Sequence, residues 1–174
     1  MRIYLATAPT KFHWQILQNL NVKNLLASFH YYRKFANGIS TLTTDNWLPQ
    51  NMIIDSGAFS VWSKGSKIDI DDYIEFCKSI KKSHPDIKFY FVNLDVLPGK
   101  LGQLPTERER EESAKKGWEN MEYMQSKGLE VIHVFHQFED FKWLEKMIRT
   151  LPYIGLSFAR NQSLIIKKKW LSKS

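Results

Sequence analysis

The sequence has a single cysteine, Cys77, and no long uninterrupted hydrophobic run. One cysteine cannot form an internal disulfide, and it has no partners for a structural zinc site, so we expect Cys77 to be a small core residue. A membrane span needs roughly 20 consecutive apolar residues. The N-terminal residues MRIYLATAPT also lack the longer apolar core of a signal peptide. We therefore expect a cytoplasmic protein that does not associate with membranes.

Two phosphate-binding motifs are also missing. No GxGxxG pattern follows the first predicted strand, and no GxxxxGK[ST] pattern occurs anywhere in the chain. These glycine-rich turns allow backbone N–H groups to approach the phosphates of a nucleotide cofactor. Their absence argues against a nucleotide-cofactor fold, and we expect the protein to use no cofactor and no metal.

Acidic residues are scarce near the C-terminus. Residues 141–174 include eight Lys or Arg residues and one acidic residue, so the whole net charge of +7 lies in this part of the chain. Four of these cations, Arg160, Lys167, Lys168 and Lys169, stand in a basic C-terminal segment at 158–174. Such a segment can meet the phosphates of a nucleic acid. A Lys-rich terminus is equally typical of a solvated surface.

Apolar, β-branched runs alternate with helical patterns along the chain. Near-continuous apolar runs are typical of strands in parallel sheets covered by helices. Six runs predict strands, at residues 2–7, 24–28, 52–55, 87–95, 130–136 and 153–157. This alternation predicts an α/β fold, either a doubly wound sheet or a TIM-type (β/α) barrel. Because six strands are too few for a complete eight-strand barrel, we expect residues 1–174 to form a single domain that corresponds to the N-terminal part of a barrel.

Three helices have recognisable starts. Asp69 can cap a helix that follows it, and Thr106 with Glu109 forms the S/T-x-x-E capping box of a second helix. Gly128 is a typical stop for that second helix. A third helix is predicted from about Glu139 to residue 152.

Polar side chains stand at the carboxyl ends of four predicted strands. These residues are Asp55, Asp95, His136 with Gln137, and Ser157. Parallel α/β folds bind ligands at this edge of the sheet, so we expect the four strand ends to converge on one pocket. Any single Asp at such a position can instead cap its own turn.

Two carboxylates in one pocket suit two kinds of function. Glycosyl transfer uses one carboxylate at the sugar carbon and another for the proton of the leaving group. Asp55 and Asp95 can also accept hydrogen bonds from the edge of a guanine base. Phe59 provides either a stacking surface for a planar ring or a buried loop anchor.

A metal-dependent hydrolase that uses Asp55, Asp95, His133 and His136 is a further candidate. The alternation of side chains along a strand argues against it, because His133 and His136 point to opposite faces. The same alternation places Asn93 on one face with Asp95.

The segment IDSGAFS, residues 54–60, resembles the Asp-Ser-Gly-Gly-aromatic motif of tRNA-guanine transglycosylases (queuine tRNA-ribosyltransferases). It is more similar still to the short phage and bacterial relatives that insert 7-deazaguanines into tRNA or DNA. The resemblance continues in chain order through FVNLDVLPG, VFHQFED and YIGLS. It implies a TIM barrel that exchanges a guanine base in nucleic acid through a covalent ribosyl–enzyme intermediate.

The resemblance also implies roles for individual residues. By matching motif positions, Asp55 is the general acid and base, Phe59 stacks on the incoming base, and Asp95 holds the guanine-like edge. The other substrate-binding residues that it implies are Ser56, Gly57, Asn93, His136, Gln137, Gly155, Leu156 and Ser157.

Three departures from the family pattern leave two hypotheses open. Ala58 replaces the second glycine, and Arg160 replaces an acidic residue that contacts an aminomethyl group in tRNA-modifying members. The family's nucleophilic aspartate lies beyond the matched region. One hypothesis is therefore a transglycosylase completed by a further part of the chain, a second chain or another copy. The other is a non-catalytic protein that binds guanine and nucleic acid.

Overall fold

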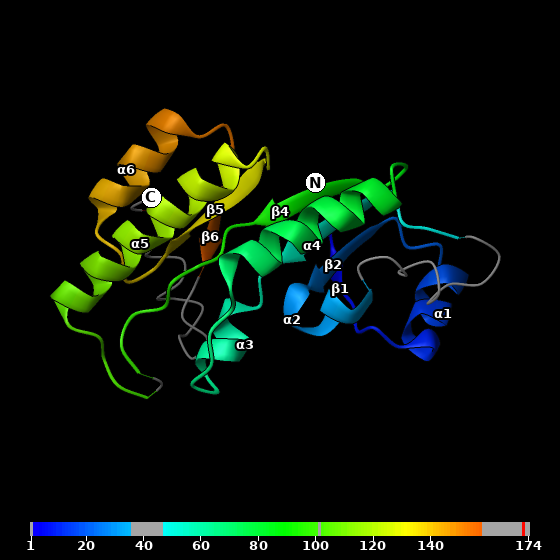
Figure 1. Cartoon of the computed structure of the whole chain (residues 1–174), viewed down its shortest axis with the longest axis horizontal. Helices are drawn as coiled ribbons and strands as arrows, with labels where there is room; N and C mark the ends of the chain where they lie inside the picture. The colour runs from blue at the N-terminus through cyan, green and yellow to red at the C-terminus, as the bar shows by residue number, and fades with distance from the viewer. Residues whose placement is uncertain (1, 36–46, 101, 158–171, 173–174) are drawn as a thin grey trace.

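Six parallel strands form the centre of the fold (Figure 1). The structure is a computed structural model that describes residues 2–35, 47–100, 102–157 and 172. The strands are β1 (Leu5–Ala6), β2 (Asn24–Ser28), β3 (Asn51–Asp55), β4 (Lys88–Val92), β5 (Val131–His136) and β6 (Ile154–Ser157). Each strand pairs in parallel with the next one along the chain.

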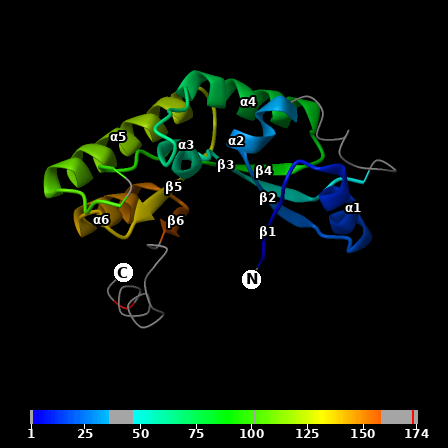
Figure 2. The same ribbon diagram turned by 90° about the horizontal axis from the view of Figure 1, so that it is seen from below.

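The strand order distinguishes between the two predicted architectures. A doubly wound sheet reverses its strand order at a switch point, whereas this sheet runs β1-β2-β3-β4-β5-β6 without a reversal. Figure 2 shows the sheet curled into a half-barrel, with α4 and α5 over its outer side. The predicted α/β class, the six strands and their parallel pairing are confirmed, and the doubly wound alternative is wrong.

The helices connect successive strands. They are α1 (Lys11–Asn19), α2 (Phe29–Tyr32), a 3₁₀ turn η1 (Arg33–Phe35), α3 (Ala58–Trp62), α4 (Ile70–Ser83), α5 (Glu107–Ser126) and α6 (Phe141–Thr150). Asp69 caps α4 by accepting the N–H groups of Asp71 and Asp72. Thr106 and Glu109 form the predicted capping box at the start of α5. Among the helices in the described ranges, none is both long and apolar enough to cross a lipid bilayer.

The start of α6 differs from the prediction. The helix begins at Phe141, because the Asp140 side chain accepts the Lys142 N–H and caps it there. Glu139 precedes this cap, and its N–H donates to the His136 carbonyl oxygen at 2.9 Å. Glu139 therefore belongs to a turn between β5 and α6 and not to the helix.

Two apolar clusters hold the helices against the sheet. In the larger cluster, Met52 and Ile54 of β3 pack with residues of α4 that include Tyr73 and Cys77. Cys77 is fully buried, as predicted from its sequence position. The smaller cluster joins α5, β5 and α6 through Trp118, Met121, Phe135, Leu144 and Met147.

Candidate ligand-binding cavity at the strand ends

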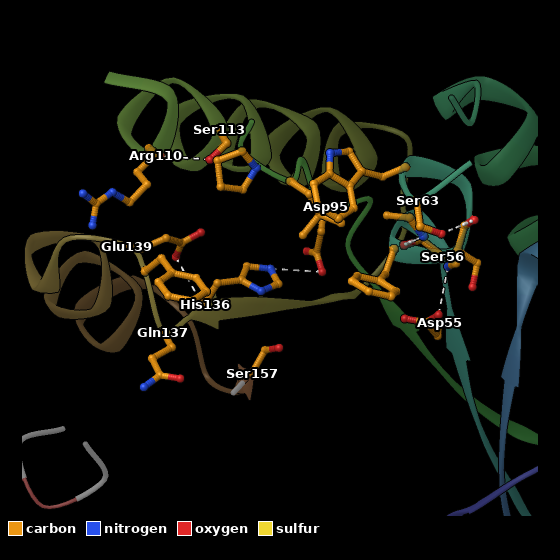
Figure 3. Close-up of a pocket in the computed structure, with 18 residues that line it drawn as sticks. Asp55, Ser56, Ser63, Asp95, Arg110, Ser113, His136, Gln137, Glu139 and Ser157 are labelled. Atoms are coloured by element: carbon orange, nitrogen blue, oxygen red, sulfur yellow. Dashed lines mark hydrogen bonds and ion pairs between the residues drawn. The ribbon is translucent and has the colours of Figure 1, made fainter. Parts of the chain in front are cut away.

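A cavity of about 940 Å³ opens at the carboxyl ends of β3 to β6 (Figure 3). Its volume lies in the range of sites that bind small molecules. Most of the site residues expected from the sequence line it: Asp55, Ser56, Gly57, Phe59, Asp95, His136, Gln137 and Ser157. The predicted convergence of the polar strand ends on one pocket is confirmed.

The end of β3 explains why an apolar run leads into Asp-Ser-Gly. Asp55 Oδ2 accepts the Gly57 N–H at 2.9 Å, which closes a tight turn before α3. Gly57 has a φ of 78°, in the left-handed region that favours glycine. A Cβ at this position would lie 2.6 Å from the His30 Cβ and 2.7 Å from the Ser28 Oγ. Asp55 thus caps its own turn and also lines the cavity, so both predicted roles occur together.

Tyr73 of α4 contacts the ends of β3 and β4, the two strands that lead to Asp55 and Asp95. Its hydroxyl lies 3.0 Å from the Ile54 carbonyl oxygen and 2.8 Å from the Val92 carbonyl oxygen. These carbonyls stand at the ends of β3 and β4, and the single hydroxyl proton can be donated to either of them. Tyr73 therefore positions the backbone immediately before Asp55.

The Asp55 carboxyl is largely buried, and burial raises its pKa. The negative charge of Asp95 adds to this increase, whereas the hydrogen bond from the Gly57 N–H opposes it. The mutual repulsion indicates that the two carboxyl groups share one electrostatic environment. A carboxyl group with a raised pKa is suited to holding a proton for transfer.

Asp95 and His136 form an ion pair inside the cavity. His136 Nε2 lies 3.2 Å from Asp95 Oδ2, and both side chains are largely buried. The Asn120 side chain holds the loop beside Asp95 by donating to the Leu94 carbonyl at 2.9 Å. Burial lowers the pKa of His136, but the neighbouring carboxylates of Asp95 and Glu139 outweigh this, so its pKa is raised.

Glu139 is a cavity residue that the sequence did not predict. Its Oε2 accepts the His136 N–H at 3.2 Å. Burial raises the pKa of Glu139 to about 7, although the charge of His136 opposes this increase. The prediction assigned Glu139 to a helix. Its position three residues after His136 is the spacing at which a Glu side chain reaches back to a backbone N–H, but the same position also suits the first turn of a helix.

Three expected site residues do not line this cavity: Asn93, Gly155 and Leu156. Asn93 is buried and donates through Nδ2 to the Gly117 carbonyl oxygen at 2.8 Å. The expectation that Asn93 and Asp95 share a strand face is wrong, because β4 ends at Val92 and the alternation stops there.

The two histidines of β5 face opposite sides, as the alternation predicts. Asn93 Nδ2 lies 2.9 Å from His133 Nδ1, whereas His136 lines the cavity. Since Nδ2 is a donor, His133 accepts at Nδ1, and burial lowers its pKa to about 4. Within the described ranges, no group of three or more His, Cys, Asp or Glu side chains is arranged to hold a metal ion.

Aromatic and cationic side chains complete the cavity wall. Phe59 is half exposed, at 48%, so its ring is accessible to a ligand. Arg110 of α5 contributes a positive charge to the wall, which the sequence did not predict. The expected nucleic-acid-binding residues Arg160, Lys167, Lys168 and Lys169 lie outside the described residues.

Comparisons of the chain with family models, curated proteins and solved structures found no match. The resemblance to transglycosylases thus depends on the four sequence motifs, and functional inference depends on the chemistry of the cavity.

Proposed function

We propose that the protein is a TIM-type, transglycosylase-like protein that exchanges guanine for a 7-deazaguanine in tRNA or DNA. The observation that carries this proposal is that Asp55 and Asp95 line one cavity and are coupled electrostatically. Phe59 lies in the same wall. Two carboxylates and an accessible ring are the groups that recognition and release of a planar base require.

The base-recognition step uses groups from three strand ends. Asp95 accepts hydrogen bonds from the ring N–H and amino groups of guanine, and the Gln137 amide can both donate and accept. The Phe59 ring stacks on one face of the base. A target base must leave its stack in the nucleic acid to enter such a cavity.

The exchange step needs a proton donor and a nucleophile. Asp55, whose pKa is raised, donates a proton to the departing guanine as the glycosidic bond breaks, and it takes a proton from the incoming base in the reverse step. The covalent intermediate needs a second carboxylate that attacks C1′ of the ribose. We assign no described residue to that role and propose that another part of the protein, a second chain or another copy supplies it.

Binding without exchange is the second candidate. The recognition groups Asp95, Gln137 and Phe59 all line the cavity, whereas the attacking nucleophile has no assignment. Such a protein would retain guanine-like ligands or nucleic acid without transferring the base.

Two assays on the same variants separate these functions. One measures exchange of labelled guanine into tRNA and DNA, and the other measures equilibrium binding of guanine and 7-deazaguanine. Exposed Asp86, which does not line the cavity, provides the control Asp86→Ala.

The transglycosylase is supported if the wild-type protein exchanges guanine and this exchange is lost both in Asp55→Ala and in Asp95→Ala. Binding without exchange, weakened at least about tenfold by Asp95→Ala but largely retained in Asp55→Ala, supports the binding protein. If neither the chain alone nor the chain mixed with a partner binds guanine, both candidate functions are contradicted.

A further inference from the structure

A short turn carries recognition groups into the cavity. His136 ends β5, and Gln137 and Phe138 follow it along the cavity wall. Glu139 closes this turn twice, because its N–H donates to the His136 carbonyl oxygen at 2.9 Å and its Oε2 accepts the His136 N–H at 3.2 Å. The Gln137 N–H donates to the Ser157 carbonyl oxygen at 3.1 Å. The turn is therefore fixed both to itself and to β6.

Charged groups from each neighbouring element share this wall. They are Asp55 from the end of β3, Asp95 from the loop after β4, His136 from β5 and Arg110 from α5. Asp95 and Glu139 both favour the protonated form of His136. Glu139 thus influences His136 through the backbone and through its charge.

We propose that Glu139 is a positioning residue that shapes the turn presenting Gln137 and orients the His136 imidazole toward Asp95. With the imidazole held against Oδ2, Asp95 keeps Oδ1 available to the donors of a ligand. The identity of that ligand, a guanine-like base, rests on the proposed function. The effect of Glu139 on His136 does not require any ligand.

The test is a pH titration of the His136 ring by NMR in ligand-free protein, with the signals assigned through His136→Gln. Glu139→Gln keeps an oxygen that can accept the His136 N–H but removes the charge, and Glu139→Ala removes both. Glu112→Gln is the control, because Glu112 is an exposed α5 residue paired with Arg108 and does not line the cavity.

Glu139→Gln is expected to lower the His136 midpoint, because the charge that favours the imidazolium is removed. Glu139→Ala should do the same and, in addition, accelerate hydrogen exchange at the His136 amide. Glu112→Gln should leave the midpoint unchanged. The proposal would be overturned if the His136 midpoint were the same in wild type and in both Glu139 variants. Faster hydrogen exchange in Glu139→Ala would not rescue it, because a purely structural role of Glu139 changes only the exchange rate of the His136 amide.

A second measurement follows guanine affinity against pH in the same proteins. The pH at which affinity falls should shift in Glu139→Gln by the same amount as the His136 midpoint. If guanine binds but this profile stays in place, Glu139 does not position the site through His136. If no variant and no wild-type protein binds guanine, the proposed function fails, while the NMR titration still decides the role of Glu139.

Discussion

Replacing Glu139 by Gln should make the protein more stable at alkaline pH. The folded protein holds this carboxyl at a pKa of about 7, above its ordinary value of 4.5, chiefly because burial penalises the charge. Below pH 4.5 the group is protonated in both the folded and the unfolded state, so it has no effect on stability. Between pH 4.5 and 7 the unfolded state releases the proton first, so the free energy of unfolding decreases as the pH rises.

The size of the effect follows from the difference in pKa. A difference of about 2.5 pKa units corresponds to an upper limit of about 3 kcal/mol above pH 7. Glu139→Gln removes this cost because its amide does not ionise. The raised pKa of His136 acts in the same direction, since the stability it contributes at acidic pH is lost as the pH rises through that pKa.

Urea denaturation at pH 5 and pH 8 measures the prediction. At pH 8 Glu139→Gln should have a free energy of unfolding higher than that of wild type by up to about 3 kcal/mol. At pH 5 it should gain little or nothing. The control Glu112→Gln, on the exposed side of α5, should show no such difference. A Glu139→Gln variant that is less stable than wild type at pH 8, or equally shifted at both pH values, would refute the electrostatic reasoning.

Three further substitutions test the construction of the site. Gly57→Ala should lower the free energy of unfolding by at least about 1–2 kcal/mol through its positive φ. Gly57→Ala should lower the free energy of unfolding more than Gly65→Ala, because Gly65 has a similar φ but open surroundings. Equal losses of stability in the two variants would exclude the contact of a Cβ with Ser28 and His30 as a cause. Tyr73→Phe should cost about 1–3 kcal/mol in urea denaturation, since the Ile54 and Val92 carbonyls lose the one hydroxyl proton that they share, and an unchanged midpoint would contradict this. Phe59→Ala should weaken guanine binding by about 1–3 kcal/mol in calorimetry while Phe59→Tyr retains it, and equal affinities would exclude stacking.

The strands of the fold could be predicted because each is a short apolar run between turn residues. The predicted and observed bounds of β2 agree, and those of β3, β5 and β6 differ by one residue at their first position. The first strand is much shorter than predicted, with only Leu5–Ala6 paired to β2. Helices α1, α2 and α3 were not predicted. α2 and α3 have only four and five residues, too few for a helical period to emerge.

The site was predicted to the extent that strand ends define it. Asp55, His136 and Ser157 end strands, and a parallel sheet brings such ends together whatever lies between them. The prediction was wrong for Asn93, which directly follows β4 and turns away from the cavity, whereas Asp95 lines it. The bend after β4 depends on packing against α5, so no local sequence pattern predicts it.

Glu139 and Arg110 were missed for two different reasons. The sequence does not show whether an acidic residue before a helix caps that helix or closes the preceding turn. Asp140 does the first and Glu139 the second, although they are neighbours. Arg110 was missed because its position on α5 is related to the cavity only through tertiary structure.

The most direct test of the central claim is to titrate the ¹⁵N-labelled protein with guanine and follow its backbone amide signals. If the ends of β3 to β6 form a base-binding cavity, the largest shifts should occur at Gly57, Gln137 and Ser157, and Asp95→Ala should abolish them. Saturable shifts confined to surfaces away from these residues, or shifts that persist unchanged in Asp95→Ala, would contradict the claim.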